Sequence, residues 1–222
     1  MADFTEIEGG LLVAEDFVAA ANASGVKDIG PDTMLLHSRR PASATATITS
    51  NRFRAAPTYV TERHVADGSA RTVIANSGNA NAATGAQGMR AAERMAELAA
   101  DGTHVPVQEA LVCSTGRIGV QLPMDRLEAG IGECCSSLGR ESAHEAARAI
   151  MTTDTFPKEC SVEFEVGGQR VGLGAISKGA GMICPNMATM LCFIATDLAI
   201  APPLLQAALG ESVARSFNCI SV

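Results

Sequence analysis

The sequence predicts a layered α/β domain that spans residues 1–222, because short apolar runs alternate along the chain with segments of helical periodicity. Apolar residues make up 47% of the chain, which supports a substantial buried core and argues against disorder. No internal repeat or low-complexity linker divides these elements. We therefore expect a single domain in which helices cover sheets.

The expected strands are short and end in turn residues. Residues 42–50 alternate small or apolar side chains with Thr and Ser, which is the period of a half-buried strand. Residues 71–75 and 110–114 are apolar runs followed by polar turn chemistry. Residues 161–166 and 169–176 flank Gly167-Gly168, a two-residue hairpin signal.

Four segments predict helices. Apolar residues recur at helical spacing over 89–99, with Gly102 as the expected stop, and over 124–138. A third helix is expected from Ser142, with Glu145 completing a capping box. Pro202-Pro203 opens the last one, which runs through position 213.

Composition excludes several classes of protein. Net charge is −7, basic residues are scattered and aromatic content is 4%, so a nucleic-acid footprint is not expected. No run of eighteen apolar residues suggests a membrane span, and residues 1–12 carry three acidic and no basic side chains, unlike a targeting peptide. The expected compartment is the cytoplasm.

Cysteine and histidine usage predicts no metal site. The seven cysteines form no Cys-x-x-Cys pair, and we expect reduced, mostly buried thiols. The histidines stand apart without ligand spacing: His37, His64, His104 and His144.

The most informative segment is residues 178–191, KGAGMICPNMATML, in which Thr189 follows a glycine-rich bend and precedes an apolar run. If the bond between Ala188 and Thr189 were cut, Thr189 would gain a free α-amine with a pKa of about 7.7–8.0. A threonine paired with its own amine is an activated nucleophile. The ordinary alternative is a buried strand at residues 187–195 after a Gly/Pro bend.

The same segment resembles the processing site of the ornithine acetyltransferase family, also called glutamate N-acetyltransferase, whose pattern is K-G-x-G-M-I-x-P-N-M-A-T-M-L. Four further blocks resemble that family in the same order: residues 76–85 (NSGNANAATG), 114–119 (STGRIG), 150–158 (IMTTDTFPK) and 216–222 (SFNCISV). The resemblance implies a fold like that of the N-terminal-nucleophile hydrolases, with sheets between helical layers.

The resemblance also implies a reaction. N-acetylornithine would acetylate Thr189, and glutamate would then take the acetyl group, in arginine biosynthesis. No cofactor is implied, although some members accept acetyl-CoA as the donor and the sequence leaves that open. An oligomer of two-chain units, each cut into residues 1–188 and 189–222 here, is expected.

Individual roles follow from the matched positions. Thr115 and Gly116 correspond to the oxyanion site, and the alternative is a plain turn whose hydroxyls cap the next helix. Thr152 and Lys178 correspond to substrate contacts of the family. The alternative for Thr152 is an exposed residue at a helix end, and the alternative for Lys178 is an ordinary surface lysine. Thr153 and Thr155 are also possible matches for the family threonine that aligns with Thr152. The asparagine-rich block at 76–85 is interpreted as structural. A phosphate loop at 172–181 is rejected, because it lacks the G-x-x-x-x-G-K-[ST] pattern.

Family chains continue beyond the block at 216–222, so this chain corresponds to an incomplete family chain, and the activity of these 222 residues alone is open. Two other functions stay in consideration: a related N-terminal-nucleophile amidase or aminopeptidase that uses water as acceptor, and a non-catalytic remnant.

Overall fold

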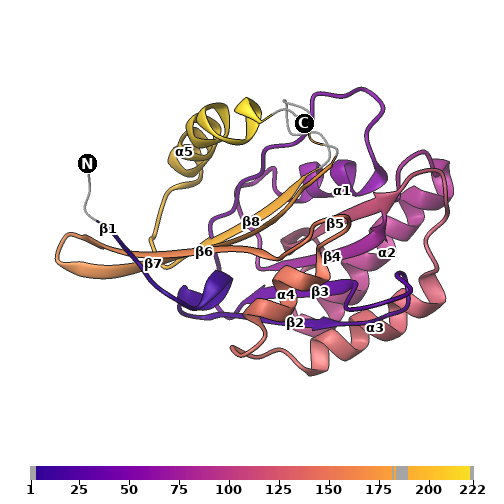
Figure 1. Ribbon diagram of the computed structural model, residues 1–222, viewed down its shortest axis with the longest axis horizontal. Helices are drawn as coiled ribbons and strands as arrows, with labels where there is room; N and C mark the ends of the chain where they lie inside the picture. Colours follow the sequence, from indigo (N-terminus) through magenta and orange to yellow (C-terminus); the bar gives the residue numbers. More distant parts are fainter. Residues whose placement is uncertain (1–3, 182, 184–189, 221–222) are drawn as a thin grey trace.

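The computed structural model describes residues 4–181, 183 and 190–220. Its strands form two four-stranded sheets, which Figure 1 shows as one layered molecule. The central sheet has the order β2-β3-β4-β5, and the outer sheet has the order β1-β6-β7-β8. The strands are β1 (Phe4–Glu6), β2 (Phe17–Asn22), β3 (Thr33–Ser38), β4 (Thr72–Asn79), β5 (Ala110–Arg117), β6 (Lys158–Val166), β7 (Gln169–Lys178) and β8 (Leu191–Thr196).

Most of the helices lie between these strands in the sequence, in agreement with the layered α/β prediction, and the last α-helix follows β8. The α-helices are α1 (Ala56–His64), α2 (Gly85–Thr103), α3 (Met124–Ser136), α4 (Ala143–Ala149) and α5 (Pro202–Arg215). Short 3-10 helices occur at η1 (Gly10–Val13), η2 (Val107–Glu109) and η3 (Phe217–Cys219).

The central sheet is buried on both faces. All six residues of β3 are buried, and its sequence, TMLLHS, does not alternate strictly between apolar and polar residues. Leu35 points to one face, where it joins a core made with helices α1, α2 and α3. Met34 and Leu36, its neighbours, point to the other face and join a core shared with η1, α4 and the outer sheet.

Strands β4 and β5 are parallel, and helix α2 makes the crossover between them. The expected strands at 71–75 and 110–114 are therefore confirmed, and both extend further than predicted. The carboxyl ends of two parallel strands meet at one edge of the sheet, which places the blocks 76–85 and 114–119 side by side.

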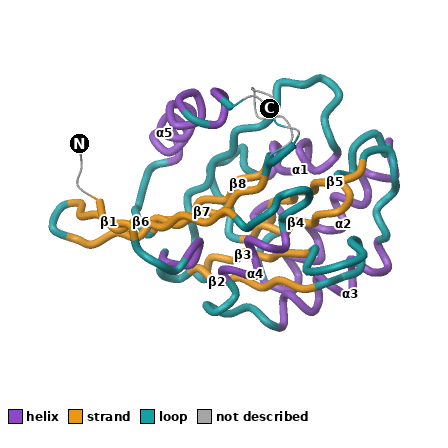
Figure 2. The backbone as a smooth tube through the Cα atoms, viewed as in Figure 1, coloured by secondary structure: helices purple, strands orange, loops and turns teal. Residues whose placement is uncertain are grey.

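The outer sheet contains the expected hairpin. β6 and β7 are antiparallel, with Val166 opposite Gln169, and both connecting residues have positive φ angles, 61° at Gly167 and 79° at Gly168. Two successive left-handed residues suit a tight hairpin turn, and glycine adopts them without a Cβ penalty. The hairpin projects beyond the central sheet (Figure 2).

The expected strand at residues 42–50 is wrong. That segment contributes an isolated bridge, from Ser43 to Ser69, and no ladder. Its backbone bonds go to the loop after α1, where Ala44 N–H donates to the Gly68 carbonyl. Alternation alone does not make a strand when no neighbouring strand is in place to pair with it.

Two details of the expected helices are also wrong. Gly102 lies inside α2, which ends at Thr103 and is followed by His104 in a left-handed conformation. A Cβ at Gly102 would lie 2.3 Å from Cys135 Sγ, so this glycine permits close packing against α3. Helix α4 begins after Ser142 as predicted, but the Ser142 side chain makes no cap hydrogen bond, and Glu145 pairs with Arg148 instead. The last helix, α5, is confirmed.

Candidate functional site

The candidate site begins where β4 and β5 end side by side. Ser77 pairs with Thr115, and Gly78 pairs with Gly116. Ligands in α/β proteins commonly bind at the carboxyl ends of parallel strands. The two residues predicted to stabilise an oxyanion, Thr115 and Gly116, thus lie at such an edge, the first half-buried and the second exposed.

Gly116 is held tightly against the neighbouring strand. Its φ is 134°, and a Cβ there would lie 2.3 Å from the carbonyl carbon of Gly78 and 2.5 Å from the backbone nitrogen of Asn79. Only glycine fits this combination of backbone angle and close approach.

Helix capping does not explain the Ser114 and Thr115 hydroxyls. β5 continues to Arg117, and the next helix, α3, follows Pro123 and has no side-chain cap. The alternative of a plain capping turn at this block is therefore wrong. The Ser114 hydroxyl instead donates to Asn76 Oδ1 at 2.6 Å.

Lys178 reaches this edge from the other sheet. It is the last residue of β7, its exposed fraction is 6%, and its Nζ donates to Thr115 Oγ1 at 3.1 Å. An ammonium has donors and no acceptor, so the Thr115 oxygen accepts and its own hydroxyl proton is free to point elsewhere. The alternative of a surface lysine is wrong.

The environment of Lys178 disfavours its charge. Burial lowers the pKa of its ammonium, the Asp154 carboxylate opposes that effect, and Lys158 adds to it. A partly desolvated cation beside a hydroxyl is suited to binding an anionic group. The ammonium has lost part of its hydration, and a bound carboxylate would compensate for that loss by pairing with the positive charge.

Asp154 ties the surroundings of Lys178 together, although the sequence did not single it out. Its side chain is fully buried. Oδ1 accepts from Lys158 Nζ at 2.6 Å and from the Gly179 N–H at 2.8 Å, and Oδ2 accepts from the Thr152 N–H at 3.1 Å. Burial alone would raise the pKa of this carboxyl, but these hydrogen bonds outweigh it and hold the pKa below the usual range.

Thr152 lies in this network through its backbone. It follows the end of α4 in a bend and is half-buried, whereas Thr153 and Thr155 are exposed. Asp154 therefore connects Thr152 to Gly179, the residue after Lys178, and so joins two of the predicted substrate contacts. Any contact of these side chains with a substrate stays a prediction.

The asparagine-rich block after β4 is a buried scaffold beneath the site. Asn76 Nδ2 donates to the Asn79 carbonyl at 2.9 Å, and Asn79 Oδ1 accepts from the Asn81 N–H at 2.8 Å. The Asn81 carboxamide in turn accepts from Thr84 Oγ1 and donates to the Gly88 carbonyl. These contacts agree with the structural interpretation of residues 76–85.

Thr189 and Ala188 lie outside the described residues, so self-cleavage and the nucleophile stay predictions. The next strand is described, and Leu191, two positions after Thr189, pairs with Lys178 in the β7–β8 ladder. The expected strand at 187–195 corresponds to β8, which begins at Leu191.

The prediction of reduced, mostly buried thiols is confirmed in part. Among the described cysteines, Cys134 is buried, Cys160 and Cys219 are exposed, and the others are intermediate; all are free. Burial raises the pKa of Cys113, two residues before Thr115, to about 12, so this thiol stays protonated.

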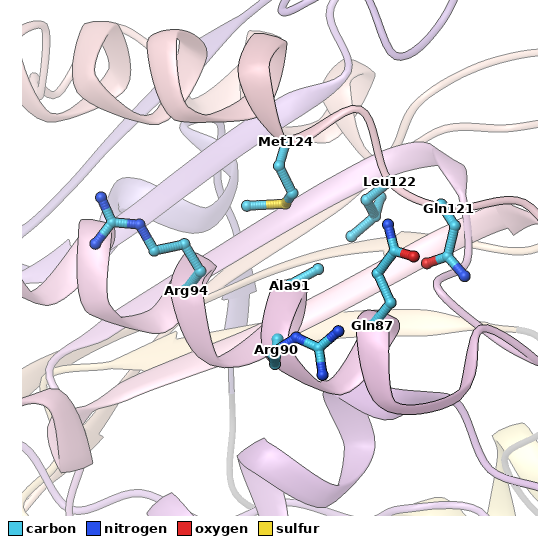
Figure 3. Close-up of a pocket in the computed structure, with 7 residues that line it drawn as sticks. All are labelled: Gln87, Arg90, Ala91, Arg94, Gln121, Leu122 and Met124. Atoms are coloured by element: carbon cyan, nitrogen blue, oxygen red, sulfur yellow. The ribbon is translucent and has the colours of Figure 1, made fainter.

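Two surface pockets lie away from this edge. One, of about 190 Å³, is lined from α2 by Gln87, Arg90, Ala91 and Arg94 and from the segment entering α3 by Gln121, Leu122 and Met124 (Figure 3). The other, of about 210 Å³, lies at residues 52–59 and 83–89. Neither includes Thr115, Thr152 or Lys178. Within the described ranges, no group of three or more metal-ligating side chains gathers, and no helix is long and apolar enough to cross a membrane.

Comparison with known proteins decides the family. The profile of the ArgJ family matches residues 18–222. The chain belongs to the ArgJ family. The arginine biosynthesis bifunctional protein ArgJ of Symbiobacterium thermophilum is 48% identical over 219 residues, which cover 97% of this chain and 54% of that protein. This member of the ArgJ family therefore spans about half the length of the curated relatives it matches.

Solved structures agree with this assignment. The crystal structure of ArgJ from Bacillus halodurans has a TM-score of 0.80 at 38% identity, covering 85% of this chain and all of that one. The ornithine acetyltransferase of Mycobacterium tuberculosis, solved with ornithine, has a TM-score of 0.76 at 35% identity, covering 82% of this chain and 98% of that one. A weaker likeness, with a TM-score of 0.50 at 11% identity, relates the fold alone to an Ochrobactrum anthropi aminopeptidase described as a variant Ntn hydrolase fold. The predicted family and layered α/β fold are confirmed.

Proposed function

We propose that the protein carrying this chain transfers an acetyl group from N-acetylornithine to glutamate, as a step of arginine biosynthesis. The observation that carries the proposal is the contact between Lys178 Nζ and Thr115 Oγ1, because it joins the predicted substrate lysine to the predicted oxyanion site. Family membership and the ornithine complex of the Mycobacterium tuberculosis relative support the choice of substrates.

Chain connectivity supports Thr189 as the nucleophile. Leu191, two positions after Thr189, pairs with Lys178, and two residues of chain span at most about 7 Å. In the proposed self-cleavage the Thr189 hydroxyl attacks the Ala188 carbonyl carbon, and the amide C–N bond breaks to give an ester and a free α-amine on Thr189. Water then hydrolyses the ester and releases the Ala188 carboxylate and the Thr189 hydroxyl.

Transfer would then proceed in two steps. The Thr189 hydroxyl attacks the acetyl carbonyl of N-acetylornithine, and its proton passes to the α-amine of the same residue. The oxyanion is stabilised by the Thr115 hydroxyl and the Gly116 N–H, and ornithine leaves with the proton on its amine. The amine of glutamate attacks the acetyl ester, and Thr189 recovers its proton as N-acetylglutamate departs.

Intact mass under denaturing conditions tests this proposal, with the protein expressed at its full genomic length beside a Thr189→Ala variant. We expect a split between Ala188 and Thr189 that the variant lacks, and acetyl transfer that depends on both substrates. An uncut, fully active Thr189→Ala protein would contradict the nucleophile.

The same assay separates the other candidates. Release of acetate from N-acetylornithine without added glutamate would favour an amidase, and an uncut, inactive wild-type protein would favour a remnant. Acetyl-CoA supplied in place of N-acetylornithine tests the alternative donor. Assembly into oligomers of two-chain units and residence in the cytoplasm stay predictions.

A further inference from the structure

The three lysines of this chain all lie around one buried carboxylate. Lys27, Lys158 and Lys178 are the lysines in the 222-residue sequence. Lys158 pairs directly with Asp154, and Lys178 precedes the Gly179 N–H that donates to the same oxygen. Lys27 lies in a different loop, and its Nζ donates to the Met151 carbonyl at 3.2 Å, next to Thr152.

The loop that carries Lys27 is fixed by a second buried carboxylate. Asp32 is fully buried and accepts the backbone N–H groups of four successive residues, 24–27, at 2.7 to 3.0 Å. Such a loop is preorganised, so the Lys27 backbone needs no ordering when a ligand binds.

The stem of Lys27 crosses the edge that holds the predicted oxyanion site. Gly78 has a φ of 94°, and a Cβ there would lie 2.8 Å from Lys27 Cγ. Gly78 is the register partner of Gly116. The side chain of Lys27 therefore lies over the end of β4 at Gly78 and reaches the segment that contains Thr152.

The carboxylates that act on Lys27 already have other partners. Burial lowers the pKa of its ammonium, Asp32 raises it, Arg148 lowers it and Asp154 raises it. Lys158 already occupies Asp154, and Asp32 is occupied by backbone N–H groups. Lys27 itself is half-buried, and toward the described residues its Nζ makes one hydrogen bond, to a neutral carbonyl, which leaves donors for an anion.

We propose that Lys27 binds a carboxylate of the amino-acid substrate, as a second cation beside Lys178. This inference rests on the function proposed above, since both substrates of that reaction carry an α-carboxylate and glutamate carries a γ-carboxylate as well. Either carboxylate has the chemistry that Lys27 would recognise. The role is substrate binding, and proton transfer is left to Thr189.

The test compares Lys27→Met, Lys27→Arg and Arg126→Met in the full-length protein. Arg126 is the matched control, because its guanidinium supports the same loop through the Gly25 carbonyl at 2.8 Å. We expect Lys27→Met to raise the KM of the substrate whose carboxylate it contacts by about tenfold or more, with a much smaller change in kcat. Lys27→Arg should recover part of this loss, and Arg126→Met should change KM less than about twofold.

Acceptor analogues identify the carboxylate. Glutamine lacks the γ-carboxylate and isoglutamine lacks the α-carboxylate, so the wild-type preference for glutamate over one of them should shrink in Lys27→Met. A raised KM for N-acetylornithine as well would assign the α-carboxylate. Unchanged KM values for both substrates and unchanged analogue preferences, in a folded Lys27→Met protein that self-cleaves and transfers normally, would overturn this inference and leave the proposed function standing.

Direct binding keeps the inference testable without turnover. If the wild-type protein is uncut and inactive, the proposed function fails, and titration with glutamate followed by calorimetry still compares wild type with Lys27→Met. Weaker binding to the variant than to wild type and Arg126→Met supports the carboxylate contact. Equal binding, or no binding to wild type, overturns it.

Discussion

The Lys178 ammonium, at the end of β7, donates a 3.1 Å hydrogen bond to Thr115 Oγ1, in β5, across the gap between the two sheets. The two residues are 63 positions apart in the sequence. This contact couples the outer sheet to the edge of the central sheet that carries Gly116.

Removing one partner of this contact should cost more than removing both. Thr115→Val removes this acceptor from a mostly buried ammonium, and we expect a loss of about 1–3 kcal/mol in the free energy of unfolding. Adding Lys178→Met should recover part of that loss, because the uncompensated charge is gone. Urea unfolding of the two single variants and the double variant measures the coupling. Additive effects would show that the contact contributes nothing in solution.

Gly116→Ala should destabilise the protein far more than Gly119→Ala. Both glycines have positive φ angles, 134° and 81°, but a Cβ at Gly116 meets the backbone of Gly78 at 2.3 Å, whereas Gly119 has open space. We expect about 1 kcal/mol for Gly119→Ala from backbone strain, and about 3 kcal/mol for Gly116→Ala when the clash is added. Chemical unfolding of both variants checks this. Equal losses of unfolding free energy in the two variants would mean that β4 and β5 move apart at Gly116 at little cost.

Protonation of His37 should destabilise the fold on acidification. His37 is buried, its Nδ1 lies 3.0 Å from Thr72 Oγ1, and burial, followed by Arg71 and Arg39, lowers the pKa of its imidazole. In the unfolded chain the imidazole is protonated as the pH falls below about 6.5, whereas in the folded chain it is protonated at lower pH. The unfolded state therefore binds more protons in this range, and the free energy of unfolding falls as the pH drops from about 6.5 toward the folded pKa.

A His37→Gln variant tests this directly. Its unfolding free energy should depend less on pH between about 7.5 and 5.5 than that of wild type, since Gln does not titrate. A His37→Gln protein with the wild-type pH dependence would assign the effect to other groups.

The described cysteines should differ sharply in reactivity. Cys160 and Cys219 are exposed, whereas burial raises the pKa of Cys113 and of Cys192 to about 12. Since the thiolate is the reactive form, we expect iodoacetamide at pH 8 to label the exposed pair at least roughly tenfold faster. Peptide mass spectrometry over a time course gives the rates, with urea-unfolded protein as the control for equal intrinsic reactivity. Fast labelling of Cys113 in the folded protein would contradict its burial.

Local sequence predicted the strands and α-helices from β4 onward and missed β1, β2, β3 and α1. It also failed where the partner of a segment decided the outcome. Gly167-Gly168 predicts its hairpin because two left-handed residues are a local requirement. Residues 42–50 have the period of a strand, but strand formation needs a neighbour, and the chain supplies a loop there. Gly102 was predicted to stop its helix, but the residue lies within α2, and the close approach of Cys135 from α3 explains why a glycine stands there.

The sequence by itself determined the layered α/β class, the family and the residues that the family pattern marks, because periodicity and motif spacing are local properties of the chain. Tertiary structure alone decided that Lys178 contacts Thr115, that Asp154 connects Thr152 to Gly179 and that Lys27 lies over Gly78. These contacts join residues from different sheets and loops. Strand pairing and the packing of one sheet on the other create them, and no pattern within a single segment encodes that geometry.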